Sequence, residues 1–384
     1  MNPIPYGRQN ITDEDLKAVT TTLNSDFLTQ GPAIDLFEKA FAEYVGAKFA
    51  VAVSNGTAAL HLCAMVLDVN DSSNVITTPI TFAASANCIR YCGGNVHFAD
   101  IDPLTYTLDI EKVKALIESK PKGYFSGIIP VDFAGFGVNL EAFRKLADDH
   151  GLWLIEDACH APGGFFTDSN GTEQRCGNGN YAELAIFSFH PVKHIACGEG
   201  GMVTTNNEEL YKKLQVLRTH GITRDPAMLV ENHGGWYYEM QTLGYNYRLT
   251  DFQAALGISQ LRRAENGLLR RREIAANYNA AFAGKDFIIW QSGAVAGHAY
   301  HLYIIQTAKR KELYDYLRGK NIFCQVHYIP VHKMPYYKGR QEPFGSLAHA
   351  EAYYEHCLSL PMFPTLNESE QAYVIEAINE FFSK

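Results

Sequence analysis

The residue with the clearest chemical potential is a lysine in an apolar turn. Lys193 ends the run Phe187-Ser188-Phe-His190-Pro-Val-Lys193, which follows a predicted strand and precedes the glycines of Gly198-Glu-Gly-Gly201. No other charged residue follows Lys193 until Glu199, so we expect it to lie against packed apolar surface. Such surroundings disfavour the ammonium form, lower the lysine pKa and free the amine as a nucleophile. A lone lysine is usually a solvated surface charge, but this one suits a Schiff base with an aldehyde.

The second candidate is an acid at the end of an apolar strand. Leu154-Ile-Glu-Asp157-Ala-Cys-His160 runs from an apolar strand through two acids to a histidine. In a parallel α/β sheet, functional groups collect at the carboxyl ends of strands, which is where Asp157 falls. Taken alone, Asp157 is at least as well explained as a helix cap or a turn residue.

The third candidate is a turn of small residues. Ser54-Asn55-Gly56-Thr57 joins a predicted strand to a predicted helix. Small side chains at that place let a phosphate approach the free backbone N–H groups of a helix start. Many α/β turns have this composition, so the motif alone favours a plain helix cap over a phosphate site.

Together, the three features match the needs of one cofactor. Pyridoxal phosphate (PLP) requires an amine for its aldehyde, a carboxylate for its pyridine nitrogen and a cradle for its phosphate. Lys193, Asp157 and the pair Gly56 and Ser188 supply these groups, in the chain order phosphate turn, acid, lysine. Asp157 and Lys193 lie 36 positions apart, which leaves room for a hairpin-like return between two strand ends.

Short apolar runs alternate with helical patterns through the first part of the chain, and these elements must position the candidates. Helices are predicted at 58–67, 83–91 and 140–150. Strands are predicted at 49–53, 75–77, 96–99, 127–131, 152–155, 182–189 and 201–205. Such alternation favours crossover connections and a mostly parallel α/β sheet that is covered on both faces.

The rest of the chain has a different pattern. A long helical region is predicted from about 250 past 272, and its arginine clusters at 262–263 and 270–272 are interpreted as a solvated helix face. Beyond about 284, strands at 301–307 and 323–328 with helices at 310–318 and 368–382 indicate a smaller α+β domain. We therefore divide the chain into 1–260 and 261–384. The stretch 224–241 lacks a clear period and is predicted to be a loop over another part of the molecule.

Composition narrows the class of protein. The 384 residues carry a net charge of −9 and a pI of about 5.9, which argues against a general nucleic-acid binder. The 8 cysteines include no Cys-x-x-Cys pair, so the usual zinc and thiol-redox signatures are absent and we predict no metal. No signal peptide or membrane span is predicted, so we expect a soluble cytoplasmic protein with no membrane partner.

Seven segments of the sequence resemble a known family. The chain is similar along its whole length to the DegT/DnrJ/EryC1/StrS sugar aminotransferases, which are fold-type I PLP enzymes. The resemblance implies a large domain with a mostly parallel seven-stranded sheet and a smaller C-terminal α+β domain. The matching segments are Leu28-Thr-Gln-Gly-Pro32, Ser54-Asn-Gly-Thr-Ala-Ala-Leu60, Thr78-Pro-Ile-Thr-Phe82-Ala-Ala-Ser85, Glu156-Asp-Ala-Cys-His-Ala161, Ser188-Phe-His-Pro-Val-Lys193, Gly198-Glu-Gly-Gly201 and Gly244-Tyr-Asn246-Tyr-Arg-Leu-Thr-Asp251.

The resemblance assigns cofactor roles by position. It implies that Lys193 carries PLP as a Schiff base and that Asp157 pairs with the protonated pyridine nitrogen. Phe82 is implied to stack on the ring, and His160 to lie by the ring or its phenolic oxygen. Plainer alternatives stay open: Phe82 as ordinary core, and His160 and His190 as structural histidines.

The resemblance also implies a phosphate site that is shared between subunits. Ser188 and the backbone at Gly56 and Thr57 are implied to hold the phosphate, and Asn246 to reach it from the partner subunit. This arrangement would make a homodimer with a composite active site. The alternative for Asn246 is an ordinary turn residue, because Gly-x-Asn is common turn chemistry.

Within the family, the segments Tyr6-Gly-Arg-Gln-Asn10 and Gln325-Val-His-Tyr328-Ile-Pro330 are most similar to the pseudaminic acid branch. This similarity implies ping-pong transfer of an amino group from L-glutamate to C4 of a UDP-linked 4-keto-6-deoxy-N-acetylhexosamine. Lys193 would move the proton between the donor α-carbon and the cofactor. The residues implied to face the sugar nucleotide are Tyr6, Asp26, Phe27, Leu28, Thr29, Gln325, Val326, His327 and Tyr328.

Three alternatives remain at this point. A related dehydratase would carry histidine at the lysine position, so Lys193 argues against it. A PLP-binding regulator would need a DNA-binding domain, and no basic helix-turn-helix pattern is present. An aminotransferase for another keto sugar, dTDP-linked or 3-keto, is the strongest competitor.

Overall fold

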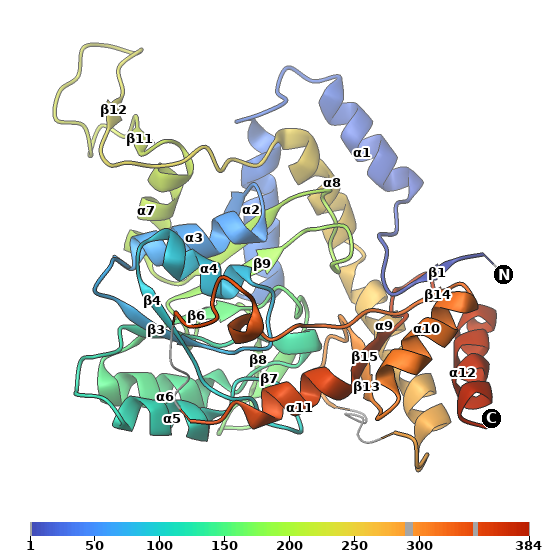
Figure 1. Cartoon of the computed structure of the whole chain (residues 1–384). Coiled ribbons are helices and arrows are strands. Elements are labelled where there is room, and N and C mark those ends of the chain that lie inside the picture. Colours follow the sequence, from blue (N-terminus) through green and yellow to red (C-terminus); the bar gives the residue numbers. More distant parts are fainter. Residues whose placement is uncertain (1, 289–294, 341–344, 384) are drawn as a thin grey trace.

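A seven-stranded mixed sheet forms the centre of the molecule (Figure 1). In this computed structural model, which describes residues 2–288, 295–340 and 345–383, the strand order is β2-β10-β9-β6-β5-β3-β4. β10 runs antiparallel to both of its neighbours, and the remaining adjacent pairs are parallel. The α/β fold with a mostly parallel seven-stranded sheet is therefore confirmed. The strands are β2 (Phe49–Val53), β3 (Asn74–Thr77), β4 (Asn95–Phe98), β5 (Gly127–Ile129), β6 (Trp153–Asp157), β9 (Leu184–Ser188) and β10 (Gly201–Thr205).

Helices cover both faces of this sheet, and the alternation of side chains in β2 explains why. Val51 and Val53 pack into one apolar cluster, whereas Ala50 and Ala52 pack into another. The first cluster joins the sheet to α3 (Gly56–Val66), α4 (Ala84–Tyr91) and α7 (Glu208–Arg218). The opposite face is covered by α2 (Pro32–Val45), α5 (Ile110–Glu118), α6 (Leu140–His150) and α8 (Asp251–Leu261). Strands buried on both faces read as continuous apolar runs, as they do in this sequence.

The C-terminal elements form a second core beside the sheet. Strands β13 and β15 pair antiparallel, and the N-terminal strand β1 pairs parallel with β14. Figure 1 shows β1 at the C-terminal side of the molecule, close to α12. The division at residue 260 stays a prediction. The elements of this part are β1 (Ile4–Pro5), α9 (Ala264–Phe282), β13 (Tyr303–Gln306), α10 (Arg310–Gly319), β14 (Ile322–Phe323), α11 (Ala348–His356), β15 (Cys357–Leu360) and α12 (Glu368–Phe382). The N-terminal helix α1 (Asp13–Leu23) instead packs against α8.

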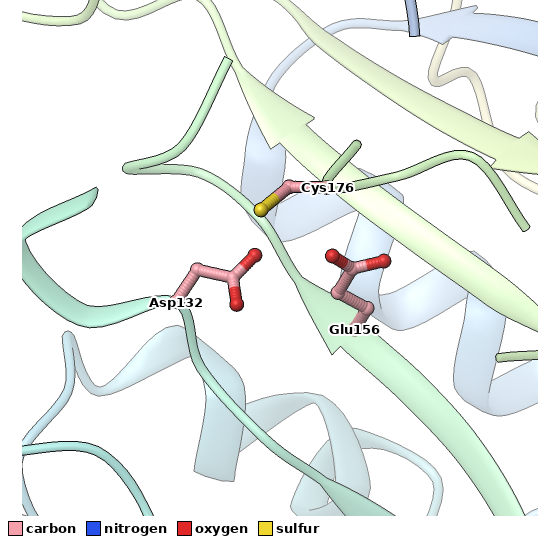
Figure 2. Close-up of side chains that lie close together, drawn as sticks. All are labelled: Asp132, Glu156 and Cys176. Carbon is pink, nitrogen blue, oxygen red and sulfur yellow. The ribbon is translucent and has the colours of Figure 1, made fainter. Parts of the chain in front are cut away.

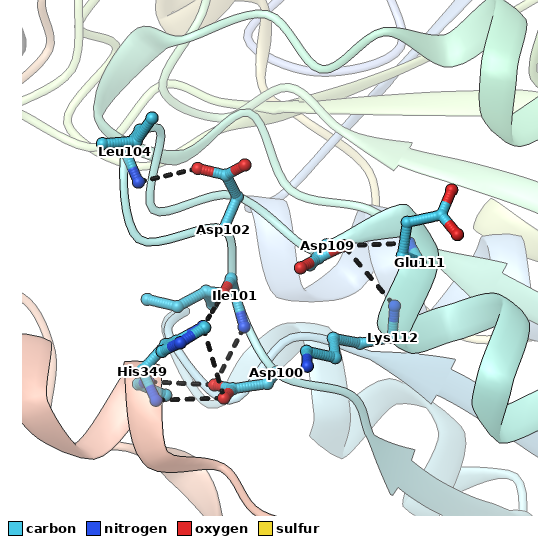
Figure 3. A network of polar contacts seen from close by, with 9 residues as sticks. Asp100, Ile101, Asp102, Leu104, Asp109, Glu111, Lys112 and His349 are labelled. Atoms are coloured by element: carbon cyan, nitrogen blue, oxygen red, sulfur yellow. Dashed lines mark hydrogen bonds and ion pairs between the residues drawn. The ribbon is translucent and has the colours of Figure 1, made fainter.

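A carboxylate from the loop after β4 ties α11 to the sheet (Figure 3). Asp100 accepts hydrogen bonds from the backbone N–H groups of His349 (3.0 Å) and Ala350 (2.9 Å), in the first turn of α11. Those donors have no carbonyl partner within the helix, so the acid both satisfies them and complements the helix dipole. Asp109 similarly caps α5 through Glu111 and Lys112.

Two predictions for the C-terminal half are wrong. The long helix is divided, because α8 ends at Leu261 and α9 begins at Ala264. The arginine clusters are not simply a solvated face: Arg263 pairs with the buried Asp15, and Arg271 is 1% exposed. The helix break rotates these side chains towards the molecule, which local charge pattern does not reveal.

Two further predicted segments have the following outcomes. The strand predicted at 323–328 is reduced to the two residues of β14 and an isolated bridge from Gln325 to Ser359. The segment 224–241 is a loop, as predicted, apart from the short strand β12 (Glu239–Met240), which pairs with β11 (Ile222–Thr223). The prediction that it lies over another part of the molecule is wrong for the single chain, because most of its residues are exposed. Figure 1 shows this arm extending away from the body of the molecule. Across the described ranges, no helix is both long and apolar enough to traverse a bilayer.

Candidate active site

A cavity of about 840 Å³ opens where the parallel strands β6 and β9 end. Asp157 is the last residue of β6 and Ser188 the last of β9, and both line the cavity. The connection between them is a crossover that carries the hairpin β7 (Phe165–Thr167) and β8 (Glu173–Arg175). The predicted hairpin-like return is therefore wrong, because β6 and β9 run in the same direction. The predicted site residues that line the cavity are Tyr6, Gly56, Thr57, Phe82, Asp157, His160, Ser188, Lys193, His327 and Tyr328.

Asp157 is held as a fixed acceptor at the floor of this cavity. The residue is 5% exposed and accepts a hydrogen bond from the Ser85 hydroxyl at 2.6 Å. The backbone N–H of Cys159 donates to its other oxygen at 3.2 Å. Ser85 lies in the first turn of α4, and its hydroxyl also contacts Thr81 at 2.8 Å. The carboxylate is thus oriented by protein donors and faces a space that can receive a cationic ring nitrogen.

The start of α3 provides the anion cradle. Asn55 caps the helix by accepting the N–H of Ala58 at 2.8 Å, and Gly56 and Thr57 lie in the first turn, where no helical carbonyl can accept their N–H groups. A Cβ at Gly56 would lie 3.0 Å from the Cβ of Ser188, so any larger residue at the start of α3 would press against the end of β9. Free N–H groups, a serine hydroxyl and the positive end of a helix dipole suit a phosphate.

Lys193 is partly buried, and its surroundings disfavour the ammonium form. Burial lowers the pKa of Lys193; the acidic neighbours Cys159 and Asp157 oppose this shift and the Arg271 guanidinium adds to it. Its Nζ lies 3.5 Å from Nε2 of His301. Burial and the lysine charge keep the pKa of His301 well below its usual range, so that imidazole is neutral. The amine therefore has a neutral contact and a reduced tendency to hold a proton, as Schiff-base chemistry requires.

His160 has a defined tautomer. Its Nδ1 accepts the backbone N–H of Ala134 at 3.2 Å, so the ring proton is on Nε2. Nε2 lies 3.2 Å from the hydroxyl of Tyr328 and can donate to it, which leaves the tyrosine O–H free to donate into the cavity. Burial lowers the pKa of His160 well below its usual range and raises that of Tyr328. Both groups are therefore neutral hydrogen-bonding partners.

Phe82 forms an aromatic wall of the cavity. Its side chain is 62% exposed, so the alternative that it is ordinary core is wrong. Its ring centroid lies 6.3 Å from that of Tyr328. An exposed aromatic ring at a cavity mouth offers a flat apolar surface against which a planar ligand can stack.

Several predicted residues lie outside the cavity of the single chain. Leu28 accepts the N–H of Asp251 near the start of α8, and the segment from Asp26 to Thr29 is exposed. Asn246 is exposed and forms a β-bridge with Thr219. The predicted site residues that do not line the cavity are Asp26, Phe27, Leu28, Thr29, Asn246, Gln325 and Val326.

The sequence did not single out several residues that the structure places at the site. Ser85 is three positions after Phe82, at the spacing of one helical turn, and this was the only local signal for it. His301 comes from the C-terminal part, so nothing near Lys193 in the sequence indicates it. Tyr247 lines the cavity and bonds to His61 through its hydroxyl at 3.1 Å.

The comparisons with known proteins agree with this geometry. Residues 9–379 match the model of the DegT/DnrJ/EryC1/StrS aminotransferase family. The chain belongs to this family. It is an aminotransferase, and because the enzymes of this family use PLP, PLP is its cofactor. The carboxylate, the lysine, the aromatic wall and the helix start fit that cofactor.

Individual relatives cover the whole chain. It is 38% identical to the spore coat polysaccharide biosynthesis protein SpsC of Bacillus subtilis, over 98% of this chain and 96% of that protein. It is 34% identical to the UDP-4-amino-4,6-dideoxy-N-acetyl-beta-L-altrosamine transaminase of Campylobacter jejuni, over 99% and 98% of the two chains. The structure of Helicobacter pylori PseC, an aminotransferase involved in the biosynthesis of pseudoaminic acid, aligns over 100% of both chains with 29% identity and a TM-score of 0.87.

Proposed function

We propose that this aminotransferase moves the amino group of L-glutamate to C4 of a UDP-linked 4-keto-6-deoxy-N-acetylhexosamine. The observation that carries the proposal is the full-length similarity to a named UDP-altrosamine transaminase together with a cavity that holds Lys193 and Asp157. The similarity to PseC supports the same substrate class. Localisation in the cytoplasm, where nucleotide sugars are made, belongs to this proposal.

The residues that would hold the cofactor follow from the cavity. Asp157 would face the pyridine nitrogen, Phe82 the ring face, and His160 with Tyr328 the phenolic side. The N–H groups of Gly56 and Thr57, with the hydroxyl of Ser188, would hold the phosphate. When bound, PLP supplies an aldehyde for the amino group and an electron sink for the carbanion.

Lys193 would carry the proton that transamination must move. Its Nζ lies against a neutral imidazole, and burial lowers its pKa, so the free amine can accept a proton and return it. His301 would orient the amine through Nε2. Tyr6 and His327 line the same cavity and would face the sugar, so they would position the carbonyl that receives the amino group.

The proposed active unit is a homodimer with composite sites. Asn246 is exposed and does not line the cavity of its own chain, so its side chain is available to the phosphate site of a second copy. The arm at 224–243 displays large apolar side chains to solvent in the single chain, including Val230 (86% exposed) and Trp236 (74%). Exposed apolar surface of this kind marks interaction sites.

The substrate proposal is tested by a panel of nucleotide sugars. Purified enzyme with PLP and L-glutamate is incubated with UDP- and dTDP-linked 4-keto-6-deoxy sugars and with a 3-keto sugar. The expected result is formation of 2-oxoglutarate and a 4-amino sugar from the UDP-linked N-acetylated substrate alone. Turnover of the dTDP-linked or 3-keto sugar without turnover of the UDP sugar would replace the proposal with the alternative of another keto sugar.

The composite site is tested by mixing two inactive variants. K193A and N246A each lose activity in a composite site, but a mixed dimer contains one site with the lysine of one chain and the asparagine of the other. Refolding a mixture should therefore restore activity, and refolding each variant alone should not. No restoration in a mixture that light scattering shows to be dimeric would contradict the shared site.

A further inference from the structure

Two buried acids, Asp132 and Glu156, lie beside Cys176 (Figure 2). The side chain of Glu156 and that of its neighbour Asp157 are on opposite faces of the sheet. Side chains alternate along β6, so Ile155 packs with the α3 and α4 cluster while Leu154 packs with the α5 and α6 cluster. Asp157 therefore shares its face with Ile155, and Glu156 points the other way. There it meets Asp132, and Figure 2 shows the two carboxylates facing each other beside Cys176.

Few hydrogen-bond donors reach the carboxyl groups of Asp132 and Glu156. Ligand atoms of Asp132, Glu156 and Cys176 lie within 4.8 Å of one another, and the two acids are 1% and 2% exposed. The N–H of Gly177 donates to both oxygens of Glu156, at 3.0 and 2.9 Å. The N–H of Val138 donates to Oδ1 of Asp132 at 2.8 Å. Oδ2 of Asp132 is buried and has no donor, and no ion pair reaches either acid within the described part of the chain.

The turn at Gly177 is built to approach Glu156. Gly177 has φ of +81°, and a Cβ there would lie 2.3 Å from Cζ of the Phe187 ring. Only glycine fits this position, and it places its N–H against the carboxyl group. The backbone thus supplies one N–H group to each acid, and the Cys176 thiol is a further, weak hydrogen-bond donor beside Asp132.

Two unpaired carboxylates in so dry a place would be costly, since each buried charge needs a partner. A proton on Glu156 removes one charge and provides the donor that Oδ2 of Asp132 lacks. Burial raises the pKa of Glu156 well above its usual range and raises that of Asp132 to about 6. Burial also raises the pKa of the Cys176 thiol, which stays neutral. The titratable groups that act on this pair are the thiol and, from the other face of the sheet, Asp157.

We propose that Glu156 and Asp132 share one proton and act as a single monoanionic unit that positions Asp157. The link is direct, because the N–H of Asp132 donates to the carbonyl of Asp157 at 3.0 Å. The N–H of Asp157 in turn donates to the carbonyl of Pro130 at 2.9 Å. Fixing Asp132 therefore fixes the end of β6, from which Asp157 faces the cavity. Glu156 and Asp132 are positioning residues, and neither lines the cavity.

The proton is tested through stability against pH, with PLP in fixed excess. In E156Q the amide N–H replaces the acid O–H as donor to Asp132, so this variant should fold and keep turnover within about threefold of wild type. A folded acid with a raised pKa binds a proton that the unfolded chain has lost, so wild-type stability falls as pH rises. Between about pH 7 and 9 the unfolding constant of wild type should rise up to tenfold per pH unit relative to E156Q. The exposed control E118Q should track wild type.

Parallel curves for wild type and E156Q would overturn the shared proton. A shift of the wild-type unfolding midpoint on adding Zn²⁺ that is lost in both E156Q and C176A would also overturn it, in favour of a metal site.

The positioning role is tested by E156A, which leaves Asp132 without its donor. The dissociation constant of PLP should rise about tenfold in E156A and return in E156Q. Unchanged PLP affinity in a folded E156A would remove the positioning role, and this readout does not depend on the identity of the sugar.

Discussion

Lys193, which is partly buried, and Arg271, which is fully buried, are two basic side chains that the fold treats in opposite ways. Arg271 is 1% exposed, and its Nη1 donates to the carbonyls of Met362, Tyr300 and His301 at 2.9, 3.2 and 3.4 Å. Burial lowers the pKa of Arg271 to about 10, so it stays charged at neutral pH. Within the described residues, the only recorded hydrogen-bond contact of the Lys193 side chain is the ring of His301.

The two cations meet at one residue. His301 offers its carbonyl to Arg271 and its Nε2 to Lys193, so a permanently charged group lies behind the lysine and lowers its pKa further. Burial alone therefore does not make a reactive amine. Whether a basic side chain keeps its proton depends on the number of fixed hydrogen-bond acceptors around it. Several carbonyls stabilise the charge of Arg271, whereas Lys193 lacks such acceptors and gives up its proton more readily.

Replacing Lys193, the reactive side chain of the two, should have the largest effect on turnover. Because Lys193 is the proposed proton carrier, K193A should lower kcat by at least about 10³-fold, while the fold stays intact. The exposed K17A serves as the control and should match wild type. Turnover of K193A within tenfold of wild type would contradict the reactive role that distinguishes Lys193 from Arg271.

Removing the structural member should affect stability instead. R271M leaves buried carbonyls without a donor, so the free energy of unfolding should fall by about 3 kcal/mol in a urea titration. R262M, at an exposed arginine that follows α8, should change it by no more than about 0.5 kcal/mol. A loss for R271M as small as that for R262M would show that the carbonyl contacts contribute little.

Asp157 extends the comparison, because it is a buried acid whose hydrogen-bond partners are fixed. S85A removes the 2.6 Å hydrogen bond to Asp157 and should weaken PLP binding by about 2 kcal/mol, or about 30-fold in Kd. The exposed S72A should leave Kd unchanged. Equal Kd values, measured by fluorescence titration of the apoprotein, would mean that Ser85 does not orient the acid.

The smallest expected effect is a slope with pH. Because the folded pKa of Lys193 is lowered, the unfolded chain binds more protons between that value and the usual lysine pKa of about 10.4. The apoprotein should therefore become more stable as pH rises through this window. Its unfolding constant should fall by up to tenfold per pH unit. K193M should lose this contribution. Identical pH curves for K193M and wild type would place the lysine in ordinary solvent.

The sheet could be predicted from sequence because its pattern is local. Each buried strand is a short apolar run, and each run from 49–53 to 201–205 appears at its predicted place within about two residues. Asp157 and Lys193 could be predicted as site residues for the same reason, since both follow predicted strands. Their convergence in one cavity is a consequence of the parallel pairing of β6 and β9.

What the sequence did not reveal depends on contacts between distant segments. Three consecutive arginines cannot indicate which of them faces the core until the helix break at 262–263 sets the rotation of α9. The pairing of Glu156 with Asp132 needs the β5 and β6 neighbours in place. Asp26 to Thr29 lie outside the single-chain cavity, so their contact with the sugar nucleotide stays a prediction.

The pairing of β1 with β14 has a consequence for the order of events during synthesis. Ile4 and Pro5 lie beside Ile322 and Phe323, and the next residue, Tyr6, is part of the cavity wall. Chains leave the ribosome from the N-terminus, so Tyr6 has no strand to hold it until the chain has been made past residue 323. Lys193 and Asp157 emerge long before that point. The nascent protein therefore contains its reactive groups well before it can enclose them, and Ile4 to Tyr6, although made earlier than either group, take their place later.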